Sequence, residues 1–432
     1  MSFPFRGALA VPALALAALL AAGSASASPC TPGGSTESGA LSPEIPASLD
    51  AVITEIRRAS PDIRASGLEA RALSAEADQA GRPLNPSLSV ELENFSGNGA
   101  LSGFDRTEST FAVEQTFRLG NKRVLSERAA RARAALGTAE CSVILREAER
   151  EAALAYADLV AAIETAALAT EAAELATELA ETVAKRVDAG AAAPPELSRA
   201  QADAASLRAE AAFAAGEVET RAYALASLWG AAEPVFGLPT AFEIAPTLAA
   251  GEPGSHPRLA AAEAAVRARE AELARARAEA IPDVTLSGGF RRFEETGDSA
   301  FVAGISVPLP IFDRGRDAAR ATGLRGEAAA VSARAVDARL RAEQLAATAS
   351  VRASNSRLFI LTDEALPEAE AAYAAALQGY AIGRFDLTTT LQARAVLIET
   401  RRAVIAARRD ARAADLILRS LIGAAPFDGD TQ

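Results

Sequence analysis

Four segments of the chain alternate apolar and polar residues, which is the period of a β-strand. In "PSLSVELE", Leu88, Val90 and Leu92 are separated by serine and glutamate, so one face is apolar and the other polar. We expect strands at about 86–95, 107–119, 282–293 and 299–311. Their lengths approach the roughly nine to eleven residues with which a tilted strand crosses a bilayer. The phenylalanines of these regions suit an aromatic girdle: Phe95, Phe104, Phe111, Phe117, Phe290, Phe293, Phe301 and Phe312.

The remaining sequence carries alanine, leucine and valine at helical spacing, with arginine and glutamate between them. Short helices are expected before Pro86 and before Pro282, and longer ones at 121–189, 196–229, 314–381 and 386–423. At 1.5 Å per residue the two longest would each be roughly 100 Å, which exceeds any compact soluble domain. The alanine-rich faces favour coiled-coil-like packing. A separate soluble bundle is the alternative, but strands are inserted in each helical half.

The chain contains one unit twice. Aligning Pro61 with Pro257 also places Pro86 on Pro282 without a gap, and "LASLWG" (225–230) matches "LRSLIG" (418–423). Self-similarity of this length indicates two equivalent supersecondary units. The expected organisation is a first repeat at 48–229, a linker at 230–257, a second repeat at 258–423 and a tail at 424–432.

Each repeat changes from strand to long helix at a defined seam. In the first repeat the seam contains Gly120 and Asn121, whereas the second has "VPLPIFDRGR". Pro308 and Pro310 lack an N–H and would end strand pairing there. Asp313 is then a candidate N-cap for the following helix.

The N-terminus has the pattern of a secretory signal peptide. Arg6 precedes an apolar run, and small residues lead to an expected cleavage near Ala27, so that 1–27 is removed and 28–47 forms an extension. A transmembrane anchor is the competing interpretation, but the run is short and contains Pro12. An exported chain can oxidise Cys30 and Cys141 to a disulfide; a lipid-anchored Cys30 and free thiols are the other interpretations.

Charge and residue counts exclude several functions. The net charge is −12 with arginine and glutamate interspersed, which argues against a nucleic-acid partner. The chain has one histidine, His256, and one methionine, so it lacks the ligands of a soft-metal site. No nucleophile–histidine set or phosphate-binding loop is present in the sequence, and neither an enzymatic activity nor a cofactor is expected.

Four strands cannot close a barrel by themselves, and an open sheet would leave unpaired backbone groups in lipid. Closure by identical subunits removes these edges. The strands therefore predict a cyclic oligomer.

The layout resembles the TolC-like outer-membrane efflux channels over almost the whole mature chain. The resemblance is carried by "NPSLSVELENF", "VEQTFRLGNKR", "IPDVTLSGGF", "VPLPIFDRGR" and "YAIGRFDLTTTLQARAVLIETRRAV". The first two segments are similar to the heavy-metal branch, which serves exporters of cobalt, zinc, cadmium or copper. The residues that carry this finer likeness are Asn85, Pro86, Glu93, Asn94, Gly120, Lys122 and Arg123.

The resemblance implies a mainly α-helical fold with membrane strands: a homotrimer with a twelve-stranded barrel in the outer-membrane lipid and a long periplasmic helical barrel. It implies the passive exit channel of a tripartite pump, working with a periplasmic adaptor and an inner-membrane RND transporter in a Gram-negative bacterium. Drug or solvent efflux, or type I secretion, is the alternative within this fold. A periplasmic adaptor or a structural coiled-coil envelope protein are the alternatives outside it.

The resemblance also places a gate and an adaptor contact at the two helical tips. The positions concerned are Asp188, Gly190, Gly383, Asp386, Thr389 and Gln392. The best-known channel of the family closes its mouth with an acidic pair, and the matching positions here are Thr389 and Gln392. The expectation is therefore a gate at these turns without an acidic ring of that kind.

Overall fold

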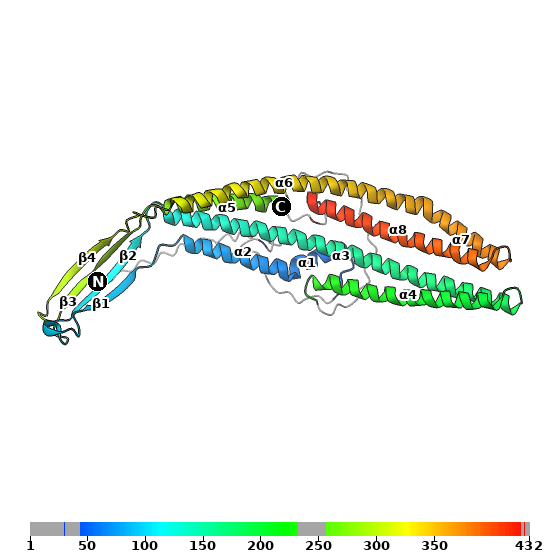
Figure 1. The fold of residues 1–432 in the computed structure, drawn as a ribbon, viewed down its shortest axis with the longest axis horizontal. Helices are drawn as coiled ribbons and strands as arrows, with labels where there is room; N and C mark the ends of the chain where they lie inside the picture. The colour runs from blue at the N-terminus through cyan, green and yellow to red at the C-terminus, as the bar shows by residue number, and fades with distance from the viewer. Residues whose placement is uncertain (1–29, 31–43, 232–255, 425–426, 428–432) are drawn as a thin grey trace, which may run out of the picture.

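A computed structural model describes Cys30, residues 44–231, residues 256–424 and Phe427. The expected signal peptide lies outside these residues, as do most of the 28–47 extension, of the linker and of the tail. The molecule is elongated, with a β-sheet at one end and long helices that run away from it to two tips (Figure 1).

The elements follow one another as two strand pairs and eight α-helices over the described ranges. The first repeat contains α1 (Leu49–Ala59), α2 (Pro61–Ala80), β1 (Ser87–Glu93), the 3-10 turn η1 (Gly99–Leu101), β2 (Glu108–Phe117), α3 (Lys122–Asp188) and α4 (Pro194–Ser227). The second contains α5 (Pro257–Ala278), β3 (Val284–Phe293), β4 (Ser299–Ser306), α6 (Arg316–Phe359), the π-helix η3 (Ile360–Ala365), α7 (Leu366–Ala381) and α8 (Leu387–Ile422).

The four strands form one antiparallel sheet in the order β1-β2-β3-β4, so strands of both repeats pair with each other. The register puts Val90 opposite Phe111, Phe111 opposite Phe290 and Phe290 opposite Phe301. This row lies on the exposed apolar face, where Phe301 is 96% exposed and the rings of Phe111 and Phe290 stack at 5.2 Å. Strands β1 and β4 are the edges of the sheet.

Helix α3, with 67 residues, is the longest element and organises the helical part. Its length corresponds to roughly 100 Å. The shorter helices α2, α1 and α4 follow one another along α3, and α5 packs against both α3 and α6 (Figure 1). Helices α7 and α8 form the second hairpin, and α8 also packs on α3 and α6.

The main apolar cluster lies halfway along α3, where both ends of the described chain converge. It joins α1, α3 and α4 to Trp229, Leu416 and Phe427, and all three of these side chains are fully buried. The Tyr156 hydroxyl donates to the Ala47 carbonyl at 2.7 Å. A disulfide joins Cys30 to Cys141 in the same region of α3, and both cysteines are buried.

The helix expected over 314–381 is helical throughout from Arg316 to Ala381, but a π-turn interrupts its α-helical hydrogen bonding. Helix α6 ends at Phe359, the π-helix η3 follows, and α7 resumes at Leu366. Pro367 has no N–H for the carbonyl four residues earlier, and its ring crowds that carbonyl. A π-turn just before it widens the backbone and relieves the conflict.

Two further boundaries differ from expectation. Strand β4 ends at Ser306 instead of 311, because the following Pro308 and Pro310 cannot donate to a strand ladder. A further helix, α1, precedes the expected short helix α2; Pro61 starts α2 at its first position, and Ser60 separates the two helices.

Candidate functional site

The two helical tips repeat one backbone motif. After α3, the Ala191 N–H donates to the Arg186 carbonyl at 2.7 Å; after α7, the Arg384 N–H donates to the Gly379 carbonyl at 2.7 Å. Between them Gly190 and Gly383 adopt φ of +70° and +75°. This pattern is a Schellman C-cap, in which glycine accepts a left-handed conformation that other residues resist.

The helices that return from the tips begin with acidic caps. The Asp386 carboxylate accepts the Thr389 N–H at 2.8 Å, and hydrogen bonding by the Thr389 side chain, followed by this N–H, lowers the pKa of Asp386. At the other tip the Glu196 carboxylate accepts the Ala193 N–H at 3.5 Å. Asp386 therefore has a local structural role as the N-cap of α8.

The remaining expected gate positions are solvent-facing. The side chains of Asp188, Thr389 and Gln392 are exposed. Within the described residues, Asp188 and Gln392 make no side-chain hydrogen bond or ion pair. Asp188 lies at the end of α3 and Asp386 at the start of α8, so the two acids belong to different turns.

The structure contains a contact between the two tips that the sequence did not predict. The Arg186 guanidinium donates to the Tyr380 carbonyl, lies 4.6 Å from the centre of the Tyr380 ring, and donates to the Ala191 carbonyl at 3.2 Å. Tyr380 is buried, and burial together with Glu196 raises its pKa. Arg186 therefore links the end of α3 to the end of α7.

A buried ion pair joins α8 to α4 close to the tips. Arg394 on α8 is 3% exposed and pairs with Asp203 on α4, whose side chain is 34% exposed. The Arg394 Nε and Nη1 atoms are buried and have no hydrogen-bond partner among the described residues. The pair holds the second hairpin against the first, but the two unpaired nitrogen atoms of Arg394 reduce the stability that it contributes.

Further arginines of α8, at positions farther from the tips, extend this contact along α3. Arg409 pairs with Asp158 at 2.6 Å, Arg401 pairs with Glu171 at 2.7 Å, and Arg408 and Arg412 share Glu164 at 3.2 Å each. All three acids belong to α3. In the sequence this row resembles an ordinary solvated helix face, because its partners lie more than two hundred residues away.

The polar face of the sheet is acidic. The register places Glu91 and Glu93 of β1 on the same face as Glu108 and Glu114 of β2. Arg291 of β3 is the only arginine or lysine on this face of the four strands, and it pairs with Glu93 and Glu108 at 2.9 Å each. Four carboxylates against one guanidinium leave a negative surface opposite the phenylalanine face.

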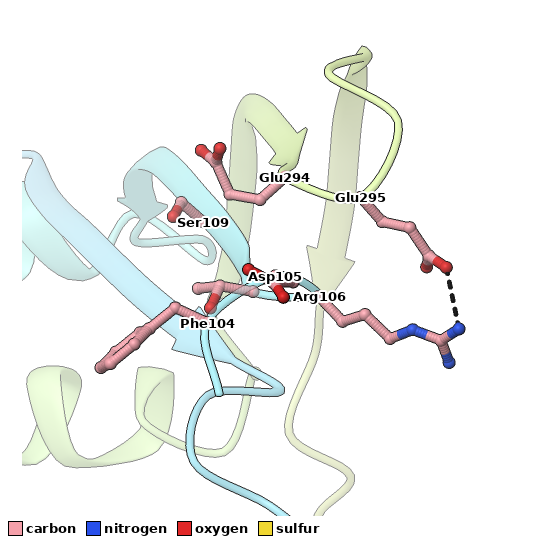
Figure 2. Close-up of a pocket in the computed structure, with 7 residues that line it drawn as sticks. Phe104, Asp105, Arg106, Ser109, Glu294 and Glu295 are labelled. Atoms are coloured by element: carbon pink, nitrogen blue, oxygen red, sulfur yellow. Dashed lines mark ion pairs between the residues drawn. The ribbon is translucent and has the colours of Figure 1, made fainter. Parts of the chain in front are cut away.

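A rim pocket of about 630 Å³ lies at the far end of the sheet, between the β1–β2 loop and the β3–β4 turn (Figure 2). Asp105, Glu294 and Glu295 line it, and Arg106 reaches across to Glu295 at 3.0 Å. Figure 2 shows Glu294 directed away from this ion pair. The rim therefore also carries more carboxylates than cations.

The two strand-to-helix seams differ. Gly120 and Asn121 have φ of +66° and +57°, and a side chain at Gly120 would meet Ile281 at 2.5 Å. Lys122 is buried and pairs with Asp283 of the second repeat at 2.8 Å. The first seam is thus fastened to the second repeat.

At the second seam, Pro308 and Pro310 lie in an exposed segment without regular structure. The sequence suggested Asp313 as the N-cap of α6, but Asp313 does not hold that position. Gly315 holds that position at φ +69°, and Asp313 accepts the Gly315 N–H at 2.8 Å. The glycine takes the left-handed conformation, and the aspartate closes the turn before it.

Across the described part of the chain, no group of three or more histidine, cysteine or acidic side chains is arranged to hold a metal ion. Glu149 is a deeply buried acid of the helical part, 2% exposed, and it pairs with Arg57 at 2.6 Å. Burial raises its pKa, as expected for a desolvated carboxylate.

Comparison with known proteins gave consistent results. The family model described as outer membrane efflux protein matches residues 52–231 and 254–424. The cobalt-zinc-cadmium resistance protein CzcC of Cupriavidus metallidurans is 28% identical over 301 residues, which are 68% of this chain and 72% of that protein. The nickel and cobalt resistance protein CnrC of the same organism is 30% identical over 287 residues, 66% of this chain and 68% of that protein.

The outer membrane protein VceC of Vibrio cholerae has a similar structure. Its TM-score is 0.72 at 23% identity, and the alignment covers 88% of this chain and 97% of that one. The fold described above is therefore that of a known outer-membrane protein.

Proposed function

Because this chain belongs to the outer membrane efflux protein family, we propose that it is the outer-membrane exit channel of a tripartite pump that exports heavy-metal cations. The substrate class rests on the names of CzcC and CnrC, which are metal-resistance proteins. The acidic face of the sheet is the observation in this chain that favours cations.

The sheet supports insertion as a trimer. Its phenylalanine face suits lipid, but β1 and β4 leave unpaired edges that lipid does not tolerate. Pairing β4 of one copy with β1 of the next removes every edge, and three copies supply twelve strands. The acidic face then lines the lumen, where negative charge concentrates cations.

The channel is passive in this proposal. Family membership supports a channel, and energy and selection are assigned to an inner-membrane RND transporter joined through a periplasmic adaptor. The tips around Gly190 and Gly383 are the surfaces proposed for the adaptor, because they are exposed and lie at the end opposite to the sheet.

The proposed gate is the separation of the second hairpin from the first. Arg186 with Tyr380, and Arg394 with Asp203, are the contacts that such a movement breaks. The glycine turns and the cap at Asp386 keep each tip intact while the hairpins move apart.

A deletion strain tests the function. Cobalt, zinc, cadmium and nickel are compared with a set of drugs, with the deletion strain carrying either an empty plasmid or the wild-type gene. We expect metal sensitivity that the gene reverses. Sensitivity to drugs alone contradicts the metal assignment and favours drug efflux by the same fold, and a soluble monomer in the periplasm contradicts the channel itself.

A further inference from the structure

A second cavity lies in the helical part, far from the sheet and the tips. It has a volume of about 410 Å³ and is lined by α3, by the start of α5, by α6 and by the end of α8. This volume is within the range of small-molecule sites. Neither the proposed passage nor the proposed gate uses this cavity.

Three arginines line the cavity. Arg146 and Arg150 come from α3 and Arg258 from the first turn of α5. Arg258 is neutralised by Glu343 of α6, and Arg146 lies 3.7 Å from Glu149. Arg150 has no ion pair within the described part of the chain.

His256 supplies a neutral donor. It is 8% exposed and lines the cavity as the N-cap of α5, where its Nδ1 accepts the Arg258 N–H at 3.1 Å. Burial lowers the pKa of His256 to about 4, so at neutral pH the ring is uncharged and carries its proton on Nε2. The Nε2–H has no hydrogen-bond partner among the described residues. Together with the N-terminal end of α5, this N–H favours an anion.

The charge balance and the aliphatic part of the lining define the anion. Glu149 is held more closely by Arg57, at 2.6 Å, so the three guanidinium groups and the two carboxylates of the lining, Glu147 and Glu343, leave one net positive charge. That balance suits a monoanion better than a dianion. The lining also contains the aliphatic side chains of Val143, Ile417 and Leu421, which suit a short hydrocarbon group.

We propose that this cavity binds a monoanionic carboxylate with a short aliphatic group, held by Arg150 and the His256 Nε2–H. A free aliphatic acid and the C-terminal carboxylate of a peptide share this chemistry. The inference is independent of the transported substrate and goes beyond the proposed function.

Calorimetric titration of the full-length oligomer in detergent tests the proposal. The probes are butyrate, the N-acetylated dipeptide acetyl-Ala-Ala, its C-terminal amide, and inorganic phosphate. We expect saturable binding of butyrate or the dipeptide at one site per chain, with weaker binding of phosphate and none of the amide. The tighter of the two carboxylates identifies the source.

Two variants and a control complete the test. Arg150→Gln is expected to weaken binding about tenfold, as for loss of one charge-assisted hydrogen bond. Ala346→Leu is expected to abolish binding by filling the cavity, and Arg208→Gln, an exposed arginine of α4 outside it, to leave binding unchanged. Equal binding of the amide, wild-type affinity in Arg150→Gln, or no binding of either carboxylate overturns the proposal.

Discussion

The buried pair of Arg394 and Asp203 predicts a specific order among three substitutions. In Asp203→Asn the guanidinium remains buried without its counterion, and such a loss costs about 3–5 kcal/mol for a fully buried pair. Asp203 is one-third exposed, so solvent screens part of this effect and we take about 2 kcal/mol. If that energy is recovered when the hairpins separate, the open population rises about thirtyfold.

Arg394→Met removes the buried charge together with its unmet Nε and Nη1 atoms, so the contact between the hairpins loses less stability than in Asp203→Asn. Glu210→Gln is the matched control, because Glu210 pairs with Arg402 at 3.5 Å between side chains that are 52% and 44% exposed. Such a pair contributes about 0.5 kcal/mol or less.

Single-channel recording in planar bilayers measures the open probability of each variant, and entry of a large antibiotic reports opening in cells. We expect Asp203→Asn to open most, Arg394→Met less, and Glu210→Gln like wild type. An open probability in Asp203→Asn equal to that of Glu210→Gln would refute the reasoning about buried charge.

Three further predictions concern the sheet, the cap of α5 and the disulfide. A Cβ at Gly289 would lie 2.0 Å from the Phe111 carbonyl oxygen, whereas a Cβ at Gly288 would have no other atom within 4 Å. Gly289→Val should therefore prevent trimer assembly in the outer membrane and Gly288→Val should not, as judged by heat-modifiable electrophoresis. The pKa of His256 is lowered from its usual 6.5 to about 4 in the folded chain, so the unfolded chain binds more protons below about pH 6.5. The free energy of unfolding should therefore fall toward pH 4, by up to about 3 kcal/mol. His256→Asn keeps a capping side chain but does not titrate, so its thermal midpoint should fall less than that of wild type between about pH 7 and 5, and parallel curves would contradict this assignment. The Cys30–Cys141 disulfide links residues 111 positions apart, so Cys30→Ala with Cys141→Ala should lower the free energy of unfolding by roughly 5 kcal/mol. A reductant should change the stability of wild type but not that of the double variant, which provides the control.

Local patterns predict the elements of this fold well, because the alternation of "PSLSVELE" and the helical spacing around it depend on nearby residues. Pairing across the repeats, such as Phe111 with Phe290, follows from the antiparallel register that the duplicated strand pairs adopt. The break in the second long helix was visible in principle at Pro367, since a proline inside a helix removes a backbone donor. The helix predicted over 314–381 did not take this proline into account.

The contacts between the two hairpins could not be predicted from the sequence. Arg186 reaches Tyr380 and Arg394 reaches Asp203 across about 190 positions, and each side chain by itself is typical of a solvated helix face. Asp386 stood among the positions expected at the tips, and its observed hydrogen bond to Thr389 is that of an ordinary N-cap. Such roles depend on which helices pack together, which local pattern does not specify.

Ion permeation through the purified oligomer tests the central claim most directly. In planar bilayers with a salt gradient, the reversal potential reports whether cations or anions pass. We predict a stable conductance that prefers cations, with a smaller preference when Glu93 and Glu108 are both replaced by glutamine, because Arg291 then makes the lumen less negative. A protein that forms no conducting pore, or one that prefers anions, would contradict an exit channel for metal cations.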